Sequence, residues 1–254
     1  MGGGLVSDTP IRGYNSDPCI FRDNDTLYVF WRECGTSICE SLGAYNTIVG
    51  VTTQDGCNFS DKKIYLKNTW KGGDLVQAPT IIKRNGIYYF YATWYQYEPE
   101  RKSKGIAIWK GTSLTQPDFE LMDTVPFPTL RLCDKKAEIR IRGHHFYLPA
   151  VKHFDLWHFD LFEYEGKLYM IACQEKDDNI ILAVAEDYVH FRPMRKPLVN
   201  NHYMENHCGY RQYYYKPTAF VKDDTLHCFW TCNDKEDGNH NVLWHSVLPM
   251  RNIK

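Results

Sequence analysis

The apolar and polar positions of this chain follow one short pattern that occurs four times. Each copy has a polar or aromatic lead-in, a kink that is a Pro in three copies, an apolar stretch, a turn and an aromatic-rich stretch. The copies begin near residues 16, 77, 157 and 215. Short alternating runs broken by turn residues such as Asn85-Gly86 and Glu165-Gly166 are typical of β-hairpins. A pattern that recurs at a long spacing indicates a repeat architecture.

Further strands follow each hairpin. We expect third strands over residues 47–53, 105–109, 180–185 and 241–246, and outer strands such as 63–66, while no long segment has helical periodicity. Four antiparallel strands per repeat, arranged around an axis, describe the blades of a β-propeller. We therefore predict an all-β, five-bladed β-propeller that forms a single domain over residues 1–254. Either residues 1–12 or an insertion at about 125–155 supplies the fifth blade.

The lead-in positions are where the repeats converge. The innermost strand of each propeller blade runs along the central channel, so equivalent lead-in positions gather at one mouth. These positions are Asp17 and Cys19, Ala78 and Thr80, His158 and Asp160, and Lys216 and Thr218. Most of them are polar, where a purely structural repeat could have been apolar. The sequence thus predicts a functional site at this mouth.

Two of these lead-ins resemble a known family. Asp17-Pro18, ahead of an apolar and an aromatic strand, resembles the first blade of the five-bladed glycoside hydrolases of family 43 and their arabinanase, β-xylosidase and levansucrase relatives. Ala78-Pro79-Thr80-Ile81 is similar to their second-blade phrase. The resemblance covers essentially the whole chain as a pattern. It implies that Asp17 is the general base, that Thr80 stands where the family has a second Asp, and that the third repeat lacks the family's general-acid Glu.

Hydrolysis with inversion needs two carboxyl groups, one protonated and one ionised, with room between them for a water molecule. Asp17 and Asp160 could form such a pair across the channel. Glu205, in the loop that leads into the fourth repeat, is the alternative acid. Glu33, at the end of an aromatic strand, is a further acidic candidate for substrate contact.

Several other side chains, Thr80 among them, are candidates for substrate binding. His158 and Asp160 lie two residues apart on one strand, which places them on one face as a dyad for sugar hydroxyls. Arg211, Tyr214 and Lys216 bring cations and an aromatic face to the fourth lead-in, and Trp94 is a second stacking platform. His144, His145 and His153 lie nearby, but their spacing matches no recognised metal site. We expect no metal and no cofactor, and a structural cation in the channel is the one alternative left open.

The amino-acid composition agrees with a carbohydrate ligand and argues against other classes of binding partner. Aromatic residues make up 15% of the chain, including 18 Tyr and 7 Trp, and such residues suit both strands and sugar platforms. A net charge of -1 argues against a nucleic-acid or membrane-surface partner. The basic stretch 131–142 also contains acids, so we expect a solvated loop there. No transmembrane run or signal peptide is visible, and the 9 scattered cysteines favour a reduced, cytoplasmic protein.

Three functions remain open at this point. The first is a glycoside hydrolase with Asp17 as base and Asp160 or Glu205 as acid. The second is a non-catalytic glycan-binding propeller, which Thr80 favours. The third is a component of cytoplasmic machinery that makes or modifies polysaccharides, in line with the absence of an export signal.

Overall fold

The computed structural model describes residues 14–41, 46–67, 74–96, 102–125, 130–141, 144–152, 156–174, 179–194, 197–200, 214–233 and 241–253. The chain divides into two compact units, Met1–Pro126 and Phe127–Lys254. The described part is almost entirely β, with one helix, α1 (Ser37–Ser41), and one 3-10 turn at Met250–Asn252. The all-β prediction is confirmed, and the single-domain arrangement stays a prediction. Among the described residues, no helix is long and apolar enough to cross a membrane.

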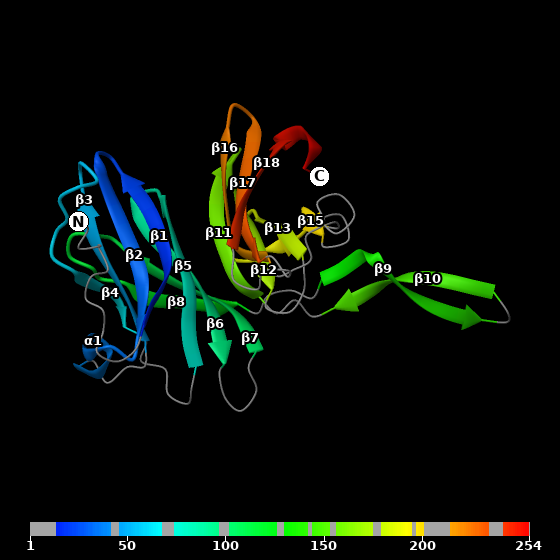
Figure 1. The fold of residues 1–254 in the computed structure, drawn as a ribbon, viewed down its shortest axis with the longest axis horizontal. Helices are drawn as coiled ribbons and strands as arrows, with labels where there is room; N and C mark the ends of the chain where they lie inside the picture. Colours follow the sequence, from blue (N-terminus) through cyan, green and yellow to red (C-terminus); the bar gives the residue numbers. More distant parts are fainter. Residues whose placement is uncertain are drawn as a thin grey trace. The chain divides into compact units, whose positions relative to one another are not determined.

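The first unit holds two four-stranded antiparallel sheets in which each strand pairs with the next along the chain (Figure 1). The strands of one sheet are β1 (Tyr14–Asp23), β2 (Thr26–Cys34), β3 (Asn46–Thr53) and β4 (Lys63–Lys67). Those of the other are β5 (Asp74–Arg84), β6 (Ile87–Gln96), β7 (Lys102–Gly111) and β8 (Glu120–Val125).

The second unit begins with a two-stranded ribbon and continues with two larger sheets. The ribbon pairs β9 (Leu130–Ile141) with β10 (His144–Lys152). The next sheet contains β11 (Leu156–Tyr164), β12 (Lys167–Gln174), β13 (Asn179–Ala185), β14 (Arg192–Pro193) and β15 (Val199–Asn200). The last sheet contains β16 (Tyr214–Lys222), β17 (Thr225–Asn233) and β18 (Asn241–Pro249).

The prediction of five blades is wrong. The described residues form four blade-like sheets, and the insertion at 125–155, a candidate for the fifth blade, contributes only the two-stranded ribbon. A blade must bury apolar side chains on both faces, and the stretch 131–142 is dominated by charged residues. Residues 131–141 of this stretch lie in β9, so the predicted solvated loop is corrected to a strand there. The other candidate, residues 1–12, lies outside the described residues.

The hairpin turns form where Asn, Asp and Gly were found in the sequence. Asn24, Asn85, Glu165 and Asp223 begin these turns with φ values of 53°, 51°, 48° and 49°. Positive φ at the first central residue matches the right-handed twist of the strands and defines the tight hairpin turn. The predicted turn positions are therefore confirmed.

Each innermost strand contains a bulge at its lead-in. In β1, β5 and β16 the register shifts between Ser16 and Cys19, between Gln77 and Thr80, and between Tyr215 and Thr218. The residue directly before the proline has positive φ in all three strands: 56° at Asp17, 47° at Ala78 and 47° at Lys216. In β11 the shift lies between Leu156 and His158. The repeated kink in the sequence is thus a β-bulge that carries a strained residue.

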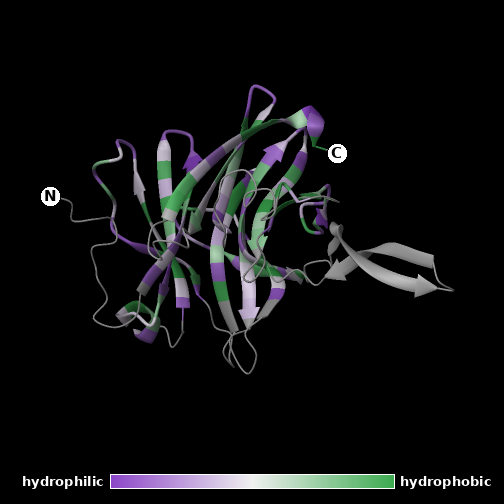
Figure 2. Ribbon diagram, turned by 45° about the vertical axis from the view of Figure 1, so that its right-hand side comes forward, coloured by the Kyte–Doolittle hydropathy of each residue, from purple (hydrophilic) through white to green (hydrophobic). Residues whose placement is uncertain are grey.

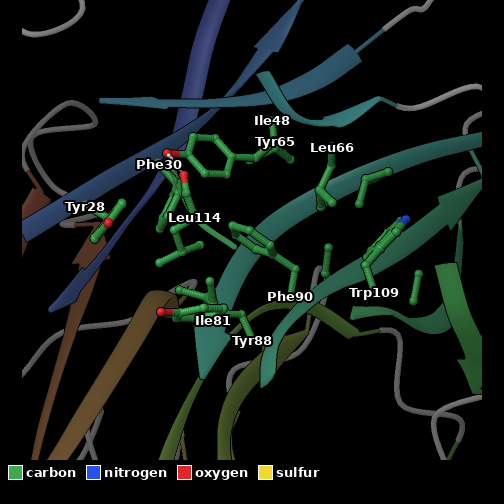
Figure 3. Close-up of a cluster of buried hydrophobic side chains, with 13 residues drawn as sticks. Tyr28, Phe30, Ile48, Tyr65, Leu66, Ile81, Tyr88, Phe90, Trp109 and Leu114 are labelled. Atoms are coloured by element: carbon green, nitrogen blue, oxygen red, sulfur yellow. Dashed lines mark hydrogen bonds between the residues drawn. The ribbon is translucent and has the colours of Figure 1, made fainter. Parts of the chain in front are cut away.

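Aromatic packing joins the two sheets of the first unit. Phe30 contacts Tyr65 and Phe90 edge to face, with ring centroids 4.8 and 4.9 Å apart (Figure 3). Phe119 contacts Phe90 with ring centroids 4.8 Å apart. Each such pair contributes about 0.5–1.5 kcal/mol beyond its buried area. In the second unit β11 lies beside β16, and a second buried cluster includes Phe162, Ile171 and Trp230. Hydrophobic residues recur along these strands, whereas the hairpin turns are hydrophilic (Figure 2).

Candidate functional site

The predicted site residues are shared between the two units. Asp17, Glu33, Thr80 and Trp94 belong to the first, and His158, Asp160, Tyr214 and Lys216 belong to the second. Glu205 and Arg211 lie outside the described residues, as does His153.

Asp17 sits in the β1 bulge with its side chain only 2% exposed. Its Oδ2 atom lies 2.9 Å from Arg32 Nε and accepts a hydrogen bond of 3.2 Å from the Ser16 hydroxyl. Arg32 Nη2 in turn donates to Ser16 Oγ at 2.9 Å. Arg32 is directly opposite Ser16 in the pairing of β1 with β2, so the hairpin itself brings the guanidinium to the carboxylate.

This arrangement fixes the Asp17 carboxylate in one position. A buried charge is tolerated only when it is paired and hydrogen-bonded, and Arg32 and Ser16 fulfil both conditions. The positive φ of Asp17 costs free energy, and such strain concentrates at functional sites. Arg32 was not among the sequence candidates, although its register position opposite Ser16 could have indicated it.

Thr80 occupies the second-repeat position on β5, where it is 3% exposed and pairs with Tyr91 of β6. It supplies a hydroxyl where a carboxylate would be needed for acid–base work. Trp94, on β6, is half-buried against the core, and the Lys104 ammonium lies 5.0 Å from its ring centroid. A cation therefore already covers part of the predicted stacking platform.

Glu33 lies in a closed polar network at the end of β2. Its Oε1 atom accepts hydrogen bonds from Trp31 Nε1 at 3.3 Å and from Lys62 Nζ at 2.7 Å. Its Oε2 atom accepts one from the Thr36 hydroxyl at 2.9 Å. The residue is 2% exposed, and both oxygens bind groups of the protein. This geometry favours a structural role, in which Glu33 holds the segment before α1 and the segment before β4 against β2.

In the second unit Asp160 connects two adjacent inner strands. The Leu161 N–H donates to its Oδ1 atom at 2.8 Å, and the Thr218 hydroxyl of β16 donates to its Oδ2 atom. Asp160 and Thr218 hold equivalent places in their repeats, since each lies four residues before the end of its strand. The structure thus joins two of the predicted lead-in positions by a hydrogen bond.

An aromatic group lies next to this pair. The His158 ring lies 4.9 Å from the Trp157 ring and 4.5 Å from the Tyr215 ring, and Trp157 and Tyr215 are 5.1 Å apart. Lys216 Nζ lies 5.3 Å from the Tyr215 ring centroid. His158 is buried, whereas Trp157, Tyr215 and Lys216 are partly exposed. The second unit therefore presents aromatic rings and a cation beside the Asp160 carboxylate.

Tyr214, which the sequence suggested as a substrate-binding residue, lies in the core. It is 1% exposed and belongs to the buried core of the second unit, while its neighbour Tyr215 joins the aromatic group. Cys173, opposite His158 in the register, is fully buried. Burial raises the pKa of the Cys173 thiol to about 12, so it is a neutral side chain here.

The described side chains include no cluster of three or more His, Cys, Asp and Glu residues that could hold a metal ion. His144 and His145 are placed only as the first residues of β10. Among the described residues, the predicted site residues therefore supply carboxylates, aromatic rings and cations.

Comparison with known proteins gives a result at the level of fold. No family model matches the sequence, and no curated protein matches it. A family 43 β-1,3-galactosidase structure has a TM-score of 0.62 at 14% identity, covering 92% of this chain and 75% of that one. A family 130 structure, from a report on glycoside hydrolases that target β-1,2-mannosidic linkages in Candida mannan, has a TM-score of 0.59 at 14% identity, covering 92% and 66%. GH43B of the Bacteroides ovatus xyloglucan PUL has a TM-score of 0.58 at 14% identity, covering 94% and 40%.

These likenesses establish the fold. The chain has the antiparallel β-propeller fold found in glycoside hydrolases, with four blade-like sheets in its described part. The chain spans 75%, 66% and 40% of the lengths of the three structures.

Proposed function

We propose that this protein acts on carbohydrates and hydrolyses a glycosidic bond, with Asp17 as the general base. One observation carries the proposal: a buried, ion-paired carboxylate stands at the strained bulge of the first repeat, where the family resemblance implies the base. The shared fold with glycoside hydrolases supports the same class of reaction.

The chemistry assigns a distinct task to each carboxyl group. A general base must be ionised to take a proton from the attacking water, and the Arg32 guanidinium compensates that charge in Asp17. The general acid must carry a proton and deliver it to the leaving oxygen. Asp160 accepts two hydrogen bonds in this structure, so it can serve as acid only when it is protonated and Thr218 turns to accept. Glu205 is the second candidate for the acid.

Substrate binding is assigned to the aromatic group of the second unit. Trp157 and Tyr215 can receive the apolar face of a sugar ring, and Lys216 and His158 can contact its hydroxyls. The two-carboxylate reaction requires no metal or cofactor. The cytoplasmic location inferred from the cysteines remains part of the proposal.

A non-catalytic glycan-binding propeller is the second candidate, and Thr80 is the observation that favours it. With a hydroxyl in place of the second Asp, the site lacks a carboxylate that the resemblance leads us to expect. This alternative retains the aromatic group and the saccharide ligand but removes the turnover.

One experiment distinguishes the two candidate functions. The protein is incubated with β-1,2-mannobiose, β-1,3-galactobiose, arabino-oligosaccharides and xyloglucan fragments, and products are followed by chromatography while binding is followed by calorimetry. Release of shorter sugars supports the hydrolase. Binding without cleavage supports the glycan-binding protein, and the absence of both contradicts a role with these saccharides.

A further inference from the structure

The first unit has a pocket of about 410 Å³ at the end of its sheets opposite to Asp17. Its lining comes from the start of β2, the end of β3, the loop after β3, the first residue of β4 and the loop between β7 and β8. Thr26 of the pocket and Arg32 of the Asp17 site lie six residues apart on β2, which corresponds to roughly 20 Å along an extended strand. The volume falls within the range of small-ligand sites, about 300–1,000 Å³.

The two charged side chains of this pocket, Asp55 and Lys63, are hydrogen-bonded to neutral groups of the protein. Asp55 accepts hydrogen bonds from the N–H groups of Cys57 and Asn58 at 2.9 and 2.8 Å and from Asn58 Nδ2 at 2.6 Å. These donors, the Asn58 N–H first, lower the pKa of Asp55. Lys63 donates to the Thr115 carbonyl at 2.8 Å. With its carboxylate and its ammonium both engaged, the pocket offers little to an anion or a metal ion.

Neutral polar groups remain for a ligand. Within the described part of the chain, the side chains of Thr26, Thr52 and Gln54 line the pocket with no internal hydrogen bond. Tyr28 and Leu114, at the edge of the aromatic core, add an apolar surface (Figure 3). Hydroxyl and amide groups around a small apolar patch match a molecule that has hydroxyls on its rim and C–H groups on its face.

The two loops that line the pocket are held in place before any ligand binds. Asp55 fixes the loop after β3, and Asp118 fixes the loop after β7 by accepting from the N–H groups of Thr112 and Ser113 at 2.8 and 3.2 Å. Tyr65 donates to the Leu114 carbonyl at 3.1 Å and ties the second loop to the first sheet. A pocket built from such ordered loops binds without a large ordering cost.

We propose that this pocket is a second saccharide subsite, which binds one neutral sugar unit away from the Asp17 site. The inference shares its ligand class with the proposed function but depends on none of the same residues. Thr26, Thr52 and Gln54 bind the sugar hydroxyls, and Tyr28 and Leu114 contact its apolar face. Such a subsite would hold a distant part of a longer glycan or a separate chain.

Amide NMR on the intact protein tests this subsite with D-mannose, D-galactose, D-xylose, L-arabinose and inorganic phosphate as probes. At least one sugar should shift the signals of residues 54–60 and 112–116 in a saturable way, and phosphate should not. The double variant Thr26→Val, Thr52→Val should bind that sugar about tenfold more weakly, since each lost hydrogen bond costs about 0.5–1.5 kcal/mol. Gln54→Ala, an exposed loop change, should weaken binding without affecting the strands.

Two control variants distinguish this subsite from the Asp17 site. Thr225→Val removes the equivalent hydroxyl from the fourth repeat and should leave the affinity unchanged, and so should Asp17→Asn. The subsite is ruled out if no sugar moves these loop signals, if only phosphate moves them, or if the double variant binds like the wild type. Any of those results leaves hydrolysis by Asp17 intact, because that reaction is measured separately.

Discussion

Asp17 illustrates how one residue can serve both the fold and the proposed chemistry. Its carboxylate is buried, its backbone is strained, and its charge is matched by a guanidinium from the neighbouring strand. Removing one partner of a buried ion pair leaves an uncompensated charge, whereas replacing both can be neutral or stabilising. Asp17 and Arg32 should therefore behave as a coupled pair in stability measurements.

Arg32→Met should lower the free energy of unfolding by about 3–5 kcal/mol, because it leaves the Asp17 carboxylate buried and unpaired. The double variant Asp17→Asn, Arg32→Met should recover much of that loss. Urea unfolding of the wild type, both single variants and the double variant gives the coupling energy. Independent, additive effects would contradict the ion pair as described.

At the scale of elements, the hairpins and bulges explain how the repeats are built. The hairpin between the first two strands of each repeat has a tight turn with positive φ, and three inner strands place their bulge at the same position before a proline. The links after β3 and β13 are also alike: Asp55 and Asp187 each accept hydrogen bonds from two backbone N–H groups that follow them. The repeated sequence therefore produces repeated turn chemistry.

Glu165→Asn should stabilise the third hairpin by about 0.5–1 kcal/mol, because Asn tolerates the left-handed conformation at φ 48° better than Glu does. Thermal unfolding should show a rise of about 2–4 °C for each kcal/mol. The reciprocal change Asn85→Glu, at the same turn position of the second repeat, should lower the midpoint by a similar amount. Equal midpoints for both variants and the wild type would argue against this turn geometry.

The hydrogen bonds of Asp187 should make the stability of the folded protein depend on pH in a specific way. Hydrogen bonds from the His190 backbone, the His190 ring and the Val189 backbone lower the pKa of Asp187 to about 2. Because the folded pKa lies below the unfolded value, this contribution is complete above about pH 4 and is lost as the pH falls towards 2. Asp187→Asn should flatten the loss of stability in that window, as measured by urea midpoints. An unchanged pH profile would contradict the assigned hydrogen bonds.

Most strands and turns could be predicted from the sequence, because strand alternation and turn chemistry are local properties. The bulges are where the sequence is misleading. Since each bulge adds one residue, Tyr215 and Thr218 face the same side, whereas Tyr214, chosen from the aromatic run before this strand, is buried in the core. The Glu33 network includes Lys62, a partner 29 residues away that the repeat does not place, whereas the position of Arg32 opposite Ser16 follows from the hairpin register.

At the scale of the whole molecule, repeats with the same turns and bulges occur in both compact units. The number of blades is not encoded in any single repeat, and the charged insertion forms a ribbon because it has too few apolar residues for another blade. The structure describes the side chains of seven cysteines, and five of them are buried. A reduced state is thus compatible with the packing of both units.

Thiol accessibility should follow this packing. Cys57 is exposed and should react first with an alkylating reagent at pH 8, whereas Cys173 and Cys228 should react only on unfolding, because burial raises the pKa of both thiols to about 12. Peptide mapping by mass spectrometry after timed alkylation measures this order. Rapid labelling of Cys173 in the native protein would contradict the described core.

The central claim, that Asp17 is the base of a glycoside hydrolase, is tested most directly by the turnover of Asp17→Asn. The assay uses whichever saccharide the wild type cleaves, with Asp25→Asn, an exposed change in the turn of the same hairpin, as the matched control. We expect Asp17→Asn to lose about 10²–10⁴-fold in turnover while it still binds the sugar, and Asp25→Asn to keep the wild-type rate. An Asp17→Asn protein that cleaves at the wild-type rate would contradict the claim.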